Sequence, residues 1–360
     1  MPVRQVNLNQ VNRLFAPREI ARVATEERRV ETPTMDRFFP QSRRRDWNQP
    51  LIPLRLITRI TKAVPLVLRG APGVSLPNAS RADKWIEPQD VSTFDAIGAV
   101  EFNNARMADL LAGGGTESQQ SWADEQSRHH LDTHRLTADA LCAQSLTGQV
   151  SYPIADKTGR IVEMFVVTFG TVQPFVANYD WTAGATTIGD IKLDLDQNYR
   201  LQQRRNRMSS RVSVGSVAMA AVYDKLEVLP NDNRTNARQL DNGDVRIGRY
   251  TLTEHNVEYY HPGTPDDSIE AGYKQVVGPT EVLMDDPNAD AALFAVVLDN
   301  FKLTGSGQAN IRFGVLNEMS EDGRSINQYA FSKPFPVPPV ESMRRGEVGP
   351  AGRVAYEPLA

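Results

Sequence analysis

The segment from Thr116 to Thr147 has no glycine or proline, and it constrains the fold more than any other stretch of this chain. Three glycines precede it and Gly148 follows it. Thr116 and Gln119 have the spacing of a capping box, in which each side chain satisfies a free backbone N–H. Gly148 can adopt the left-handed conformation that ends a helix. We therefore expect one helix here, about 46 Å long at roughly 1.5 Å per residue.

The two halves of this expected helix differ in polarity. Between Glu117 and His130 only Trp122 and Ala123 are apolar, so we expect that half to lie outside a core. The second half carries an apolar stripe at helical spacing, made of Leu131, Ala138, Leu141, Cys142 and Leu146. A long, half-polar helix is typical of an extended molecule whose shape depends on its neighbours.

Composition excludes several classes of protein. The chain has 40% hydrophobic and 23% charged residues, which is ordinary for a soluble folded protein. No apolar run approaches the ~18 residues of a membrane span, and the first ten residues lack the apolar core of a signal peptide. The single cysteine, Cys142, excludes an internal disulfide and fits a reducing compartment. Its position on the apolar stripe favours a core residue over a nucleophile.

Charge is distributed unevenly along the chain. The net charge is −4, but residues 1–45 contain ten arginines and five acidic residues, a net of +5. The remainder therefore carries −9. A basic leading segment on an acidic body predicts docking on an acidic surface of protein or nucleic acid, or alternatively a solvated tail.

The first hundred residues read as an arm followed by an extended region. In the arm, Phe38 and Phe39 lie among polar residues, and we expect them to insert into a groove. Arg43, Arg44 and Arg45 form the densest basic run, for which a solvated loop is the alternative. In the extended region, Gly70, Pro72 and Gly73 have the turn chemistry of a hairpin tip and lack the lysine of a phosphate loop.

The remaining segments mix helices and strands in irregular order. A hairpin is expected at 150–154 and 161–169, and helices are expected in the second half of 178–207 and from Ser216. Further strands are expected at 211–215, 245–247, 250–252, 281–284, 293–298, 301–303 and 311–316. Prolines confine 329–340 to an edge or outer segment. The pattern predicts an α+β fold, without βαβ alternation or internal repeats.

The histidines give the only candidate for chemistry on the long helix. His130 and His134 are four residues apart, a spacing at which two imidazoles can share a metal, and His129 and Asp132 lie beside them. No HExxH glutamate, cysteine pair or third ligand accompanies them, so we interpret this as a solvated polar face.

Other candidate sites are weaker. Asp285, Asp286, Asn288 and Asp290 resemble a calcium loop only in composition, because the turn glycine and the closing glutamate are absent. His255 and His261 flank Tyr259 and Tyr260 in an expected loop, and no serine or cysteine nucleophile set stands out. The sequence therefore predicts no enzyme, no metal and no cofactor.

Several short stretches, in their order, resemble the lambda-type capsid protein E family of tailed-phage major capsid proteins. These stretches are Trp85-Ile-Glu-Pro88, the long helix with Gly148-Gln-Val-Ser-Tyr152, Asn178-Tyr-Asp-Trp181, Gly243-Asp-Val-Arg-Ile247, Val277-Gly-Pro-Thr-Glu-Val-Leu-Met284 and Gln328-Tyr-Ala-Phe-Ser-Lys-Pro-Phe-Pro-Val337. No single stretch is specific, but the resemblance covers nearly the whole chain.

The resemblance implies the Hong Kong 97-type capsid fold, with an N-terminal arm, an extended loop, a peripheral domain and an axial domain. We expect the following division: 1–50 as the arm, 51–100 as the extended loop and flanking strands, 101–185 as the peripheral domain with spine helix 116–147, 186–320 as the axial domain, and 321–360 as the return strand of the peripheral domain and a tail.

The implied function is self-assembly into the hexamers and pentamers of an icosahedral shell around double-stranded DNA, inside the host cytoplasm and then in the virion. Portal, scaffold and decoration proteins are implied partners, and we expect no membrane partner and no covalent crosslink between subunits. The expected inter-subunit contacts are Phe38, Phe39, Arg43, Arg44, Arg45, Gly70, Pro72, Gly73 and Trp85. An encapsulin-like compartment is the alternative, and a metal-dependent hydrolase using His130, Asp132 and His134 is a remote one.

Overall fold

A computed structural model describes residues 8–26, 30–57, 81–98, 117–155, 160–203, 209–228, 236–265, 269–298, 313–320 and 325–350. The chain divides into two compact units. The first contains residues 1–51, 87–142 and 292–337, and the second contains 52–86, 143–291 and 338–360. Both mix helices and strands, which confirms the α+β class. None of the helices in the described ranges is long and apolar enough to cross a membrane.

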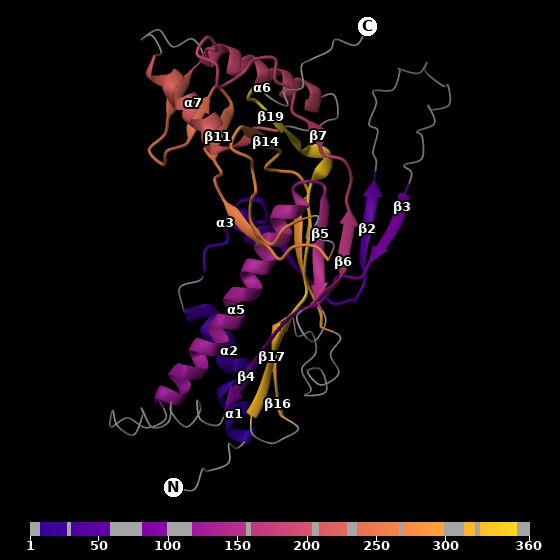
Figure 1. The fold of residues 1–360 in the computed structure, drawn as a ribbon. Helices are drawn as coiled ribbons and strands as arrows, with labels where there is room; N and C mark the ends of the chain where they lie inside the picture. The colour runs from indigo at the N-terminus through magenta and orange to yellow at the C-terminus, as the bar shows by residue number, and fades with distance from the viewer. Residues whose placement is uncertain are drawn as a thin grey trace, which may run out of the picture. The chain divides into compact units, whose positions relative to one another are not determined.

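The first unit combines helices with two three-stranded sheets (Figure 1). Its helices are α1 (Leu8–Leu14), α2 (Pro17–Glu26), α3 (Pro33–Phe38), the 3-10 turn η1 (Gln41–Arg43) and most of α5 (Glu117–Ser145). One sheet has the order β16 (Phe313–Met319), β17 (Ser325–Ser332) and β4 (Val91–Gly98). The other has the order β1 (Arg44–Trp47), β15 (Ala292–Val296) and β18 (Pro334–Val337). The edge position predicted for 329–340 is confirmed for the proline-rich β18, but it is wrong for 329–332, which belong to β17, the central strand of the first sheet and upstream of the prolines.

Helix α5 is the long helix that the sequence predicted. It has 29 residues, and Gly148 follows it with a φ of 90°, the left-handed conformation expected at its end. Thr116 and the side chain of Gln119 lie outside the described residues, so the capping box does too. The polar first half is less exposed than its composition predicted, because fully buried Ala123 packs with Val11, Phe15, Ile97 and Ile326. One face of that half therefore belongs to the core of this unit.

The second unit is built on a seven-stranded sheet (Figure 1). The strand order is β7 (Gln173–Pro174), β19 (Arg344–Glu347), β14 (Glu281–Asp285), β8 (Arg211–Val214), β11 (Tyr250–Glu254), β10 (Val245–Ile247) and β9 (Ala237–Gln239). Helices α6 (Ile188–Gln203) and α7 (Ser216–Glu227) share one buried apolar cluster with these strands. Trp181, Ile191, Leu195, Met219 and Tyr250 are among its fully buried members, so the core of this unit lies between helices and sheet.

Three hairpins and the turn η2 (Val340–Ser342) complete the second unit. The hairpins are β2 (Ile52–Ile57) with β3 (Arg81–Ile86), β5 (Gln149–Ala155) with β6 (Ile161–Thr168), and β12 (Glu258–His261) with β13 (Gly272–Gln275). The β5–β6 hairpin confirms the sequence prediction. The expected loop around Tyr259 and Tyr260 is wrong, because these residues form strand β12. The strand expected at 301–303 lies outside the described residues.

Candidate assembly surfaces

Phe38 and Phe39 are buried within the single chain. Their exposed fractions are 2% and 0%, so neither side chain offers area to another subunit. Phe39 closes α3 by donating its N–H to the Met35 carbonyl at 2.9 Å. The groove into which the sequence placed these rings is therefore inside the subunit, and the candidate contacts are found elsewhere.

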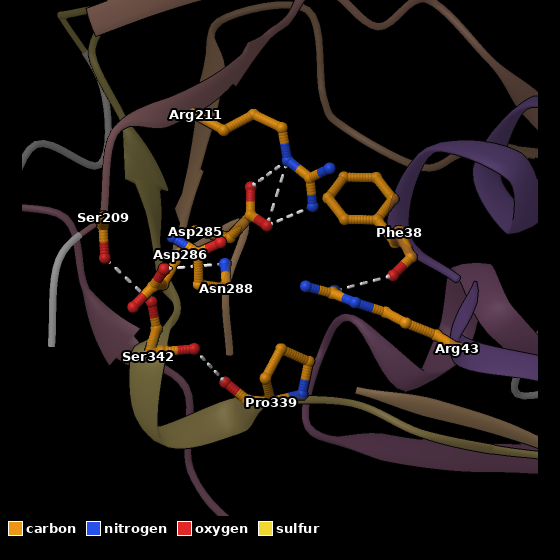
Figure 2. Close-up of polar contacts among 9 residues, drawn as sticks. All are labelled: Phe38, Arg43, Ser209, Arg211, Asp285, Asp286, Asn288, Pro339 and Ser342. Atoms are coloured by element: carbon orange, nitrogen blue, oxygen red, sulfur yellow. Dashed lines mark hydrogen bonds and ion pairs between the residues drawn. The ribbon is translucent and has the colours of Figure 1, made fainter. Parts of the chain in front are cut away.

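Of these three arginines, two make hydrogen bonds and one makes none within the described part of the chain. Arg43 donates to the Phe38 carbonyl at 3.3 Å (Figure 2). Arg44 donates to the Phe39 carbonyl at 3.0 Å and pairs with Asp36. Arg45 is exposed on β1, and its guanidinium has no hydrogen-bond or ion-pair partner among the residues that the structure describes. Arg43 and Arg44 thus fix the segment after α3.

Trp85 is the exposed aromatic residue of the β2–β3 hairpin. It lies opposite Pro53 in the register, and 56% of it is exposed. Gly70, Pro72 and Gly73 belong to residues 58–80, outside the described part of the chain. Burial of such an exposed ring would remove apolar surface from solvent, which is favourable.

Two further strands carry exposed apolar side chains that the sequence did not single out. On β6, Val162 and Val166 are 56% and 52% exposed. On β4, Phe94 is 57% exposed and contacts Tyr329 of β17 with ring centroids 5.1 Å apart. The available signal was the lack of strict alternation, because each of these strands has apolar residues on both faces. Apolar residues on both faces of a strand indicate that both faces are covered. The sequence does not identify what would cover the exposed face.

The histidines of α5 form a buried polar seam, not a solvated face. His130 and His134 are 3% and 4% exposed. The Thr93 hydroxyl lies 2.8 Å from His130 Nδ1 and 3.1 Å from His134 Nε2. His130 Nε2 is 3.1 Å from Gln328 Oε1, and His134 Nδ1 is 2.5 Å from Ser332 Oγ. The prediction of a solvated face is wrong, because His130 and His134 are buried against hydrogen-bond partners from β4 and β17.

One proton arrangement is consistent with these four hydrogen bonds. His130 Nε2–H donates to Gln328, Thr93 donates to His130 Nδ1, His134 Nε2–H donates to Thr93, and Ser332 donates to His134 Nδ1. Both imidazoles are then neutral. Burial agrees with this, since it lowers the pKa of His134 to about 4, and burial likewise lowers the pKa of His130 despite the raising effects of Gln328 and Asp95.

The seam has no ring nitrogen available for a metal. All four are occupied by protein partners, and the described residues contain no group of three metal-ligating side chains. A hydrolase mechanism through His130, Asp132 and His134 therefore has no geometric support. Asp132 instead pairs with Arg135 at 3.2 Å. The seam joins α5 to the sheet, and its role is structural.

Two carboxylates of the acidic turn after β14 are also hydrogen-bonded. Arg211 Nε lies 2.9 Å from Asp285 Oδ1 and 3.1 Å from Oδ2, and Asp285 is 1% exposed (Figure 2). Asp286 Oδ1 accepts the Asn288 N–H at 2.9 Å, which stabilises the turn. Nearby, Ser209 donates to the Ser342 carbonyl at 3.0 Å. The guanidinium already neutralises Asp285, and the described residues include no group of three metal-ligating side chains at this turn.

The chain is similar to several solved structures. A crystal structure of a protein assigned as the capsid protein of a prophage in E. coli CFT073 matches 95% of this chain and 98% of its own, with 13% identity and a TM-score of 0.57. The mature capsid of bacteriophage PhiM1 matches 93% and 91%, with 12% identity and a TM-score of 0.47. The SrpI encapsulin of Synechococcus elongatus PCC 7942 matches 94% and 97%, with 9% identity and a TM-score of 0.42. No curated protein sequence matches.

The fold, with a long helix seamed to one sheet and a separate helix-covered sheet, is the Hong Kong 97-type fold of viral capsid subunits. The model of the phage major capsid protein E family matches residues 16–346, and the chain belongs to that family. It is a major capsid protein of a tailed phage, a structural component of the virion capsid and not a catalyst, and its copies associate in an icosahedral shell. The resemblance inferred from short sequence stretches is thereby confirmed.

Proposed function

We propose that the subunits form hexamers and pentamers, and that the shell encloses double-stranded DNA without sequence-specific binding. The observation that carries this proposal is the family match over residues 16–346. The net charge of −4 supports confinement of DNA, because tight binding would require a basic face to neutralise phosphates. Contacts repeated around closed rings would supply the stability of the shell through many modest interfaces.

The inter-subunit contacts proposed from the sequence are refined by burial. Arg45 and Trp85 are the strongest candidates, because both are exposed and Arg45 has no partner in the described part of the subunit. Arg43 and Arg44 would act by holding the segment that presents Arg45. Gly70, Pro72 and Gly73 would form the tip of the extended loop. The five-part division into arm, loop, peripheral domain, axial domain and return strand belongs to the same proposal.

Other virion proteins complete the proposed assembly. A portal, a scaffold and a decoration protein would each contact the shell, whereas the contact of the subunit with itself is established by its class. Covalent crosslinking is not part of the proposal. Boiled particles should therefore release single chains on a denaturing gel.

Electron microscopy of the purified full-length protein, with light scattering on the same sample, tests the proposal. We expect closed shells or rings built of hexamers and pentamers, and nuclease-resistant double-stranded DNA in shells taken from lysed hosts. Shells that hold a protein cargo and no DNA would instead identify an encapsulin-like compartment. A monodisperse monomer or dimer at every salt and protein concentration would contradict both assignments.

A further inference from the structure

The hairpin β12–β13 presents an exposed face with the composition of a docking site. Tyr260 and Tyr273 lie opposite each other in the register, with ring centroids 5.6 Å apart in an edge-to-face arrangement. They are 52% and 73% exposed. Glu258 and Gln275, the next opposed pair, are exposed on the same face. The two hydroxyls and the Glu258 carboxylate have no partner within the described ranges of the chain.

The opposite face of the hairpin is anchored to its own subunit. His261 is 3% exposed, lies 3.4 Å from the Ser151 carbonyl of β5 through Nε2, and packs edge-on against Tyr152. Its Nδ1 accepts the Gly263 N–H at 3.0 Å. Thr264 and Ile269 close the connecting loop with hydrogen bonds of 3.0 and 2.9 Å. The tyrosine pair is therefore held on a supported element, which reduces the entropy lost when a partner binds.

The chemistry of this face selects a cation. Two electron-rich rings beside a carboxylate suit an arginine, whose guanidinium can stack on one ring and donate to Glu258. The chain uses the same chemistry internally, where the Arg249 guanidinium lies 4.5 Å from the centre of the Tyr199 ring. Residues 258–275 contain four acidic side chains and one lysine, so this segment of the sequence carries a net negative charge. Tyrosine and arginine are also the residues that most often dominate protein interfaces.

We propose that this face, made of Glu258, Tyr260, Tyr273 and Gln275, binds Arg45 of a second copy of the chain. Residues 1–45 carry a net charge of +5, which complements the acidic hairpin, and Arg45 is the exposed member of its run without a partner in the described residues. The proposal rests on the self-assembly proposed above, and it names one specific contact within it. Each subunit would offer the arginine to one neighbour and the tyrosine pair to another.

A charge reversal in the full-length protein tests the contact. Glu258→Arg and Arg45→Glu should each reduce the fraction of protein that sediments as shells about tenfold or more, and the double variant should restore it. Tyr260→Ala with Tyr273→Ala should reduce assembly in the same way, while the two Tyr→Phe changes should retain it. Glu254→Arg, an exposed glutamate outside this face, is the matched control and should have no effect. A double variant no better than the weaker single variant would overturn the proposal.

Crosslinking between chains gives a second measurement. In a Cys142→Ala background, chains with Arg45→Cys are mixed with chains with Glu258→Cys before assembly, then treated with a short thiol–thiol crosslinker. A dimer on a denaturing gel from the mixture, and from neither chain alone, is expected; its absence from assembled shells overturns the proposal. If the unaltered protein assembles and the contact fails both tests, self-assembly stands. If the unaltered protein forms no shells, the proposed self-assembly is contradicted, and the contact that rests on it is contradicted too.

Discussion

The carboxylate of Asp139 on α5 accepts the backbone N–H of Met35 at 2.6 Å, in the first turn of α3. Thr32, the residue before this short helix, makes no side-chain cap of its own. The long helix thus supplies a capping group to the N-terminal segment, 104 residues away in sequence. Asp139 is 5% exposed, so this cap is formed in a setting that disfavours its charge.

Lowering the pH should increase the contribution of Asp139 to the stability of the fold. Burial raises the pKa of its carboxyl from 3.8 to about 6, against the lowering effect of the Met35 N–H. The protonated form is therefore favoured in the folded state. Its contribution to the free energy of unfolding is complete below pH 3.8 and is lost as the pH rises through about 6. Asp139→Asn keeps an acceptor oxygen without the charge, so it should gain stability relative to the unaltered protein as the pH rises, by about 3 kcal/mol.

Urea unfolding of the unassembled chain at pH 4 and pH 7 measures this difference. Asp139→Ala, which removes the acceptor as well, should be less stable than Asp139→Asn at both values. A constant difference between the asparagine variant and the unaltered protein across this range would show that the carboxyl titrates normally.

The histidine seam should have the opposite pH dependence. Burial lowers the pKa of His134 from 6.5 to about 4, so its stabilisation is present above pH 6.5 and is lost as the pH falls toward 4. His134→Gln carries no titrating group, and the stability difference from the unaltered protein should shrink by about 3 kcal/mol over that window. His129→Gln, at an exposed neighbouring position outside the seam, is the control and should keep the loss of stability attributed to His134. Equal profiles for both variants would contradict the assignment of a neutral, buried His134.

The seam also shows where sequence reasoning fails. The segment 116–147 has caps and an apolar stripe, which are local signals, and the predicted helix agrees with α5 within two residues at its C-terminal end. Burial of His130 and His134 depends on Thr93 and Gln328, which are 37 and 198 residues distant from His130. A polar helix face reads as solvated until those partners are known. The strand β12 was missed because adjacent Tyr259 and Tyr260 lack a clear alternation of polarity.

The assembly surfaces are only partly visible in sequence for a different physical reason. Phe38 and Phe39 have the composition of contact residues, yet the subunit itself buries both. Arg43 to Arg45 look equivalent in sequence, and only the carbonyls of Phe38 and Phe39 distinguish the engaged arginines from the free one. Exposure is a property of the folded chain, so composition alone cannot separate an interface residue from a core residue.

Gly215, the residue before α7, should tolerate no side chain. A Cβ at this position would lie 1.9 Å from the Gly278 carbonyl oxygen and 2.6 Å from that of Pro279, and both are backbone atoms. Its N–H also donates to the Glu281 carbonyl at 2.9 Å, which holds it against β14. Gly215→Ala should cost about 3 kcal/mol of unfolding free energy through overpacking. Gly184→Ala, where no atom lies within 4 Å, is the control and should be near neutral in the same denaturation experiment.

Arg211 and Asp285 should be far more sensitive to loss of one partner than to loss of both. Arg211→Met leaves the 1%-exposed Asp285 carboxylate without its cation, and breaking such a pair costs about 3–5 kcal/mol. Asp285→Asn in the same chain removes the stranded charge and should recover more than half of that loss. Chemical denaturation of the two single variants and the double variant measures the coupling, and Arg238→Met on the edge strand β9 is the exposed control. Additive losses would mean that water reaches Asp285, and that the pair contributes no more than a surface ion pair.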